Sequence, residues 1–142
     1  MRAATATRRK TRRPARPGRP CPAFSPGSRK QAAESAGFDG FAPDACLVNR
    51  YAPGARLSLH QDKDERDHSA PIVSVSLGMD ATFLFGGHKR TDRPARLPLR
   101  HGDVVVWGGE DRLRYHGVLP LKDDPHPLLG SQRINLTFRK AG

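Results

Sequence analysis

The feature that most constrains the fold of this chain is a rapid succession of short strand-like segments, punctuated by Gly, Pro and Asp. Almost no helix-forming stretch lies between these segments. Such a pattern favours an antiparallel sandwich or barrel, and the double-stranded β-helix, or jelly roll, is the natural candidate. We therefore expect a mainly β fold of about eight short strands. The predicted strands are Ala45–Tyr51, Arg56–His60, Ile72–Leu77, Thr82–Phe85, Ala95–Leu99, Asp103–Trp107, Arg114–Leu119 and Arg133–Arg139.

The charge of the chain is divided unevenly between its first stretch and the rest. The formal net charge is +11 over 142 residues, yet residues 1–30 hold ten Lys or Arg and no acid. This stretch also has five prolines and little that is apolar, which predicts disorder. We expect a disordered basic Arg/Pro-rich tail over residues 1–30 and one domain over residues 31–142. The tail fits a phosphate-binding arm, a transit-like peptide or an incidental extension from an unusual start site, and its low complexity favours the last.

Two further features bear on the compartment. Cys21 and Cys46 form no redox or metal-binding spacing, and no apolar run is long enough to span a bilayer. We expect a monomer in the reducing cytosol, with no membrane partner.

The run His60-Gln61-Asp62 ends one predicted strand and is a candidate metal site. Alternate residues of a strand share a face, so His60 and Asp62 are expected to lie with Ser58, while Leu57 points the other way. With a second histidine from a distant strand, they would form the two-His-one-carboxylate set of non-haem Fe(II) oxygenases. Taken alone, a surface His-x-Asp at the end of a strand is the commoner explanation.

His116 is the candidate for that second histidine, because it lies in a predicted strand far along the chain. By itself, a histidine in a strand is more often hydrogen-bonded and structural than a metal ligand.

The last predicted strand carries an unusual polar face. Arg133, Asn135, Thr137 and Arg139 alternate with Ile134, Leu136 and Phe138. Asn49 and Tyr51 share a face in the same way. Such faces either meet water or line the interior of the barrel, where guanidinium, amide and phenol groups would suit a small dicarboxylate.

Several of these stretches together resemble the AlkB family, in order from about Gln31 to Gly142. This family consists of Fe(II)- and 2-oxoglutarate-dependent dioxygenases that use O₂ to repair alkylated nucleobases. The resemblance is carried by Asn49–Gly54, Leu59–Glu65, Gly102–Gly109, Tyr115–Gly117 and Arg133–Arg139.

The resemblance implies roles for individual residues. His60, Asp62 and His116 would be the iron ligands. Arg133, Tyr51 and Asn135 would bind the distal carboxylate of the co-substrate 2-oxoglutarate. Arg139 and Asn49 would bind the end of it that chelates the metal. Asp64 and Arg90 would contact the substrate, and Trp107 is explained equally well as part of the substrate pocket or of the core.

The resemblance also implies partners, and one departure leaves the substrate open. The expected substrate is alkylated single-stranded DNA, with RNA as an alternative. Family members carry an aromatic lid before the first strand, but no Trp or Tyr precedes Tyr51 here, so this lid is expected to be absent. The alternatives are therefore a truncated relic that binds iron and 2-oxoglutarate without repair, a dioxygenase for another substrate, and a basic nucleic-acid-binding module.

Overall fold

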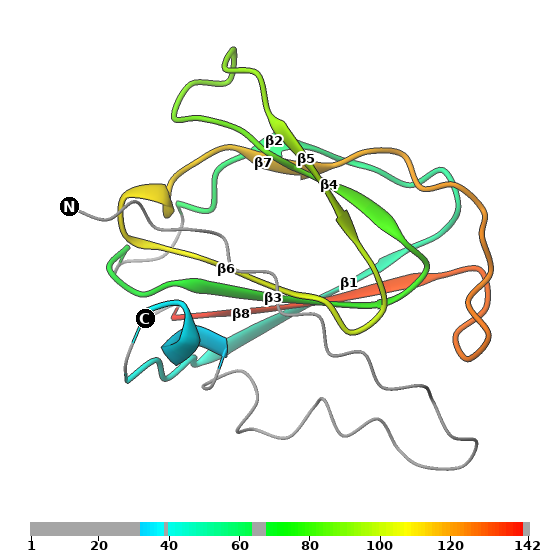
Figure 1. Ribbon diagram of the computed structural model, residues 1–142, viewed down its shortest axis with the longest axis horizontal. Coiled ribbons are helices and arrows are strands. Elements are labelled where there is room, and N and C mark those ends of the chain that lie inside the picture. Colours follow the sequence, from blue (N-terminus) through cyan, green and yellow to red (C-terminus); the bar gives the residue numbers. More distant parts are fainter. Residues whose placement is uncertain (1–31, 39, 64–67, 141–142) are drawn as a thin grey trace.

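The computed structural model describes residues 32–38, 40–63 and 68–140, and within them eight strands form two antiparallel four-stranded sheets (Figure 1). The predicted tail, residues 1–30, lies outside the described residues. The first sheet has the order β1-β8-β3-β6 and the second the order β2-β7-β4-β5. The strands are β1 (Ala45–Tyr51), β2 (Leu57–His60), β3 (Ile72–Gly78), β4 (Ala81–Phe85), β5 (Ala95–Leu99), β6 (Val104–Trp107), β7 (His116–Val118) and β8 (Arg133–Arg139).

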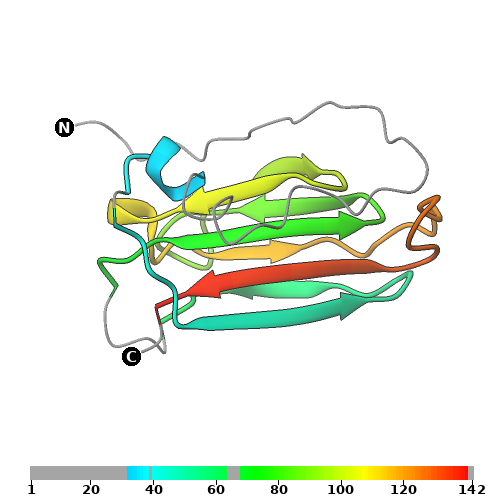
Figure 2. The same ribbon diagram turned by 90° about the horizontal axis from the view of Figure 1, so that it is seen from below.

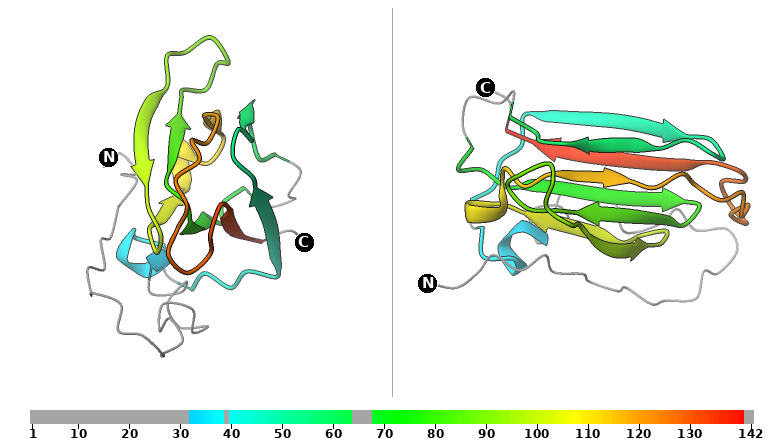
Figure 3. Two further views of the ribbon diagram at one scale, coloured as in Figure 1. Left: turned by 90° about the vertical axis from the view of Figure 1, so that its right-hand side faces the viewer. Right: turned by 90° about the horizontal axis from the view of Figure 1, so that it is seen from above.

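The two sheets face each other as the layers of a jelly roll, which confirms the predicted fold class (Figure 1). The first sheet, with β1 at one edge and β6 at the other, is seen in Figure 2, and the second is seen from above in Figure 3. Strand order departs from sequence order, so the last strand, β8, lies between β1 and β3. This topology brings segments that are far apart in sequence to one interior. Among the described residues, no helix has the length and apolarity needed to cross a membrane.

Apolar side chains cover both faces of the first sheet. On its outer face, Phe138 and the valines Val73, Val75 and Val106 pack against Ala33, within the helical turn at residues 32–35, and against Phe41, which follows that turn. Gly37 follows that turn with a φ of 91°. On the inner face, the core between the sheets is built mainly from Tyr51, Ile72, Met79, Phe83, Phe85, Val105, Trp107 and Leu121.

The alternation predicted for β8 is confirmed. Leu136 and Phe138 contribute to the outer cluster, whereas Arg133, Asn135 and Thr137 are buried on the opposite face. The polar face of this strand therefore lines the interior instead of meeting water.

The alternation predicted for β2 is wrong at one point. Leu57 pairs with Val118 and His60 pairs with His116, so three steps along β2 match two along β7. The extra residue is a β-bulge, which shifts the facing of the strand by one position. As a result Leu57, expected to point away from His60, lines the same cavity as that histidine.

Candidate metal centre

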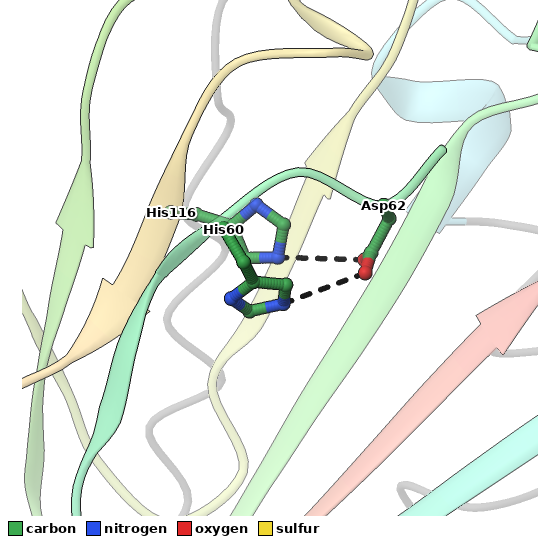
Figure 4. A group of neighbouring side chains, drawn as sticks. All are labelled: His60, Asp62 and His116. Atoms are coloured by element: carbon green, nitrogen blue, oxygen red, sulfur yellow. Dashed lines mark ion pairs between the residues drawn. The ribbon is translucent and has the colours of Figure 1, made fainter. Parts of the chain in front are cut away.

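Three side chains, carried by β2, by the segment directly after it and by the neighbouring strand β7, converge on one point (Figure 4). His60 ends β2, Asp62 follows two residues later, and His116 begins β7 directly opposite His60. Each can offer one ligand atom, and these atoms lie within 4.8 Å of one another. The carboxylate of Asp62 is 3.5 Å from Nε2 of His60 and 3.4 Å from Nε2 of His116. The three residues thus lie together as expected, whereas their ligation of an ion stays a prediction.

Backbone carbonyls fix the orientation of both imidazoles. Nδ1 of His60 lies 2.9 Å from the carbonyl oxygen of Ser58, and Nδ1 of His116 lies 3.3 Å from that of Arg114. A carbonyl accepts only, so each Nδ1 carries the proton and donates. Each Nε2 therefore faces Asp62, to which it donates when the imidazole is protonated, and a metal ion would take the place of that proton. Such outer partners are what orient histidines for metal binding.

The charges around this cluster suit a cation. Burial acts to raise the pKa of Asp62, but hydrogen bonds from His116 and His60, together with the charge of Arg139, hold that pKa well below its usual range. The hydrogen bond to Asp62 raises the pKa of His60, against the opposing effect of burial. The carboxylate is therefore ionised at neutral pH, as a metal ligand must be. A carboxylate and two imidazoles are a donor set that Fe(II) accepts, with positions left for further ligands.

One cavity contains this cluster and the polar face of β8. Its lining combines the three candidate ligands with polar residues of the first sheet and aromatic residues of the core. The polar members are Asn49, Tyr51, Ser74, Arg133, Asn135, Thr137 and Arg139, and the aromatic ones include Phe83 and Trp107. Every residue predicted to bind 2-oxoglutarate thus lines the same cavity as the candidate metal ligands.

Arg133 is the most telling of these residues. It is 1% exposed, and one of its nitrogens, Nη2, donates to the hydroxyl of Ser76 at 3.0 Å. Its guanidinium carbon lies 5.0 Å from the ring centre of Tyr51. Its other two nitrogens, Nε and Nη1, have no hydrogen-bond partner among the residues that the structure describes. Burial lowers the pKa of this guanidinium and raises that of the Tyr51 phenol.

A buried cation with unused donors costs folding free energy unless a ligand completes it. Proteins retain such a group where it binds an anion, and a carboxylate is the anion that a guanidinium matches best. The cavity therefore fits a small acid bound beside the metal cluster.

Two other predicted co-substrate residues, Asn135 and Arg139, have protein partners. The amide of Asn135 donates to the Ser74 hydroxyl at 2.7 Å and the Val75 carbonyl at 3.2 Å. Its oxygen accepts from Thr137 at 2.9 Å, so this side chain ties β8 to β3. Arg139 lies 3.5 Å from Asp62 through Nη1. Contact of Asn135, Arg139 and Asn49 with 2-oxoglutarate stays a prediction.

The three predicted substrate residues fall in different places. Trp107 is 3% exposed, and its ring centre lies 5.6 Å from that of Phe83 and 5.0 Å from that of His116. Its Nε1 has no hydrogen-bond partner within the described part of the chain. It is therefore both a core residue and part of the cavity wall. Arg90 is exposed on the β4–β5 connection, donates to the Leu59 carbonyl at 2.6 Å and lies 5.1 Å over Tyr115. Asp64 lies outside the described residues.

Sequence reasoning missed several residues that build this site. Ser74 and Ser76 alternate with valines in β3, and this period-two polar pattern is a signal that could have revealed them. Gln61 and Arg112 hold the segment of Asp62 through backbone contacts, and nothing in their sequence context indicates it.

Gly117 is a further residue that the site requires. A Cβ placed on it would lie 2.6 Å from the carbonyl oxygen of Leu57 and 3.2 Å from the amide nitrogen of Leu59, both in the bulged strand. We expect Gly117→Ala to push β2 away from β7, to cost about 1–3 kcal/mol of unfolding free energy, and to weaken metal binding. Thermal unfolding and metal titration of the variant are the measurements.

Gly86→Ala is the control for this prediction. The corresponding Cβ would lie 3.2 Å from the nearest atom, the Tyr115 carbonyl oxygen, so a smaller loss is expected. Equal losses in the two variants would count against a special role for the close approach at Gly117.

Comparison with protein families places these observations in context. The model of the family described as the 2OG-Fe(II) oxygenase superfamily matches residues 2–139. The alpha-ketoglutarate-dependent dioxygenase AlkB of Escherichia coli is 67% identical over 113 residues, which cover 80% of this chain and 52% of that protein. The nucleic acid dioxygenase ALKBH1 of Mus musculus is 40% identical over 98 residues, 69% of this chain and 25% of that protein. The tRNA demethylase abh1 of Schizosaccharomyces pombe is 37% identical over 107 residues, 70% of this chain and 35% of that protein.

Solved structures agree with these relatives. The structure of OsALKBH1 matches with a TM-score of 0.70 and 34% identity, covering 80% of this chain and 62% of that one. A 2OG-Fe(II) oxygenase family oxidoreductase from Burkholderia pseudomallei matches at a TM-score of 0.57 and 16% identity, over 78% of this chain and 50% of that one, which supports the fold alone. The chain spans about half the length of the Escherichia coli relative that it matches.

Proposed function

The chain belongs to the 2OG-Fe(II) oxygenase superfamily and, within it, to the AlkB family; from this we propose that it demethylates nucleobases oxidatively, with Fe(II), 2-oxoglutarate and O₂. One observation carries the proposal most directly. A His-Asp-His cluster and a buried guanidinium with two unused nitrogens line the same cavity. The first offers ligands for a metal and the second a partner for a carboxylate.

The residues divide the work between metal and co-substrate. His60, Asp62 and His116 would hold Fe(II) through two Nε2 atoms and a carboxylate oxygen. Arg133, with Tyr51 beside it, would bind the distal carboxylate of 2-oxoglutarate. Arg139 and Asn49 would lie toward the end nearer the metal, since Arg139 already contacts Asp62.

The bound metal, with 2-oxoglutarate and O₂, would supply the oxidising power. The co-substrate 2-oxoglutarate would leave as succinate and CO₂. A methyl group on a ring nitrogen of the base would become a hydroxymethyl group, which would be lost as formaldehyde. The chain's own residues orient the reactants. Phe83 and Trp107 pack around the ring of His116 and keep that side of the cluster apolar. A base has to leave its stack to reach a centre of this kind, which favours single strands and weakened pairs.

The substrate end of the proposal rests on fewer observations. Arg90 is exposed next to the end of β2 and is held there by Leu59 and Tyr115, so it would meet the nucleotide that carries the base. Asp64 and Trp107 complete the substrate residues that we propose. Among the relatives, names refer to nucleic acids in one case and to tRNA in another, so both DNA and RNA belong in the test. A monomer in the cytosol also stays a prediction.

The experiment is to incubate the full chain with Fe(II), 2-oxoglutarate and air, together with a single-stranded oligonucleotide that carries one N-methylated adenine or cytosine. Mass spectrometry of the oligonucleotide should show loss of the methyl group and recovery of the unmodified base, in DNA, RNA or both. Omission of 2-oxoglutarate is the control. Metal and 2-oxoglutarate binding without any restored base would instead identify a relic or a dioxygenase for a different substrate.

A further inference from the structure

We propose that Arg112 and Gln61 form a reciprocal clamp that positions Asp62 for metal binding. The clamp joins the segment that carries His60 and Asp62 to the turn that leads into His116. This inference rests on the proposed function, because it gives Arg112 a part in building the metal centre. Arg112 is a positioning residue in this account, since it acts on the metal through Asp62.

The guanidinium of Arg112 lies at the centre of the clamp. The residue is 2% exposed, and its Nη1 donates to the carbonyl oxygen of Asp62. Its Nε donates to the carbonyl oxygen of Ala70 at 3.0 Å. Asp62 follows the end of β2, and Ala70 precedes the start of β3. One buried side chain therefore holds both ends of the β2–β3 connection.

Gln61 makes the matching contact in the opposite direction. Its Nε2 donates to the carbonyl oxygen of Leu113 at 2.8 Å. A side chain of each segment thus donates to a backbone carbonyl of the other: Arg112 to Asp62, and Gln61 to Leu113. In each segment, the donating residue is next to the accepting one. The backbone is held on both sides of the Asp62 Cα, so the carboxylate keeps its aim at the two imidazoles.

The turn that carries Arg112 is itself anchored. A short 3-10 helix, η2 (Gly109–Asp111), ends at Arg112. Two residues later, Arg114 donates to Asp111 at 3.0 Å and to the carbonyl oxygen of Gly86. Arg112 therefore holds Asp62 against a turn that is itself fixed in place, and Arg112 lies four residues before the ligand His116.

Arginine has a chemical reason to be at this position. Two carbonyl oxygens accept from two different nitrogens of one planar group, which an ammonium on a flexible stem cannot reproduce. Arg112 is absent from the lining of the cavity, so contact with the co-substrate or the base does not account for it. A purely local structural role would not require contact with the residue that ligates the metal.

The test measures binding of Co²⁺ to the metal-free full chain by its visible absorption, and then binding of 2-oxoglutarate at saturating Co²⁺. Arg112→Lys is expected to weaken Co²⁺ binding by about 10–100-fold, as loss of an outer partner of a metal ligand does. Affinity for 2-oxoglutarate at saturating metal should change little, because Arg133 is untouched. In Arg112→Ala, millimolar guanidinium should restore part of the Co²⁺ affinity by filling the vacated space.

Arg100→Lys is the matched control, because it makes the same exchange at an exposed arginine that pairs with Asp80 at 3.7 Å and does not line the cavity. It should leave the Co²⁺ affinity within about 2-fold of the starting chain. Gln61→Leu, which removes the other half of the clamp without removing a buried charge, should weaken Co²⁺ binding and keeps the test valid should Arg112→Ala not fold.

The proposal of a clamp would be refuted if Arg112→Lys and Gln61→Leu bound Co²⁺ with the same affinity as the unsubstituted chain. Equal losses of Co²⁺ affinity in Arg112→Lys and Arg100→Lys would also refute it, since they would show a general effect of replacing an arginine by lysine. Failure of the unsubstituted chain to bind Co²⁺ would refute the proposed function instead, so the two failures are distinguishable.

Discussion

Replacement of Asp62 by alanine is expected to weaken divalent metal binding by more than about 100-fold, beyond the range seen when an outer partner of a ligand is lost, and to abolish turnover. Asp62 is the only carboxylate of the cluster, and both histidine Nε2 atoms face it at 3.4–3.5 Å. Without it, two neutral imidazoles would remain beside the cation Arg139, an arrangement that repels a metal ion. Titration with Co²⁺ or Mn²⁺ and assay of succinate formation are the measurements.

Asp80→Ala is the matched control for this variant. It removes one carboxylate that lies on the surface and pairs with Arg100 at 3.7 Å. Asp80 belongs neither to the cluster nor to the lining of the cavity. Metal affinity and turnover should be unchanged in it, since exposed ion pairs contribute little. Metal binding by Asp62→Ala at the affinity of the unsubstituted chain would refute the metal-ligand assignment.

Arg133→Met should separate ligand binding from stability. We expect the affinity for 2-oxoglutarate to fall by about 100-fold or more, as it does when one partner of a buried charge pair is lost. The ligand-free protein, however, should be as stable as the unsubstituted chain or more so. Two nitrogens of the buried guanidinium have no partner among residues 32–38, 40–63 and 68–140, and an apolar side chain of similar length removes that cost. Calorimetric titration with 2-oxoglutarate and thermal unfolding without it measure the two effects.

Arg133→Lys provides the comparison within the same position. It keeps the positive charge but not the planar donors, so 2-oxoglutarate binding should be weaker than in the unsubstituted chain and stronger than in Arg133→Met. A strong loss of stability in ligand-free Arg133→Met would show that the guanidinium serves the fold. Unchanged 2-oxoglutarate affinity in both variants would overturn its assignment to the co-substrate.

Much of this architecture could be predicted because its signals are local. The period of two in Arg133–Arg139 requires the arginines and Asn135 to share a face, and burial of Leu136 and Phe138 on the other side then directs that face inward. The short strands with Gly and Pro between them likewise left few folds other than two packed sheets. The meeting of His60 with His116 could not be derived this way, because pairing of β2 with β7 is a property of the whole topology. The resemblance to a family supplied that pairing.

Other features depend on contacts that no local pattern records. The bulge in β2 reverses the expected facing of Leu57, and at this point the backbone of β2 lies so close to Gly117 of the partner strand that a Cβ there would meet it. Arg112 lies in a polar turn that looks exposed in sequence, yet the structure buries it against two carbonyls. The sequence left the role of Trp107 open between the core and the substrate pocket. In the structure it belongs to both, because core residues form part of the cavity wall. The roles of residues 1–30 and Asp64, and the predicted absence of a lid, lie outside the described residues.

The central claim is that this site couples oxidation of 2-oxoglutarate to removal of a methyl group from a base. Its most direct test is the stoichiometry of succinate and formaldehyde, measured in the same reaction with methylated single strand, unmethylated strand or no strand. The account predicts equal amounts of the two products with the methylated strand and little of either without it. Succinate formed at the same rate in all three reactions, with no formaldehyde, would contradict it.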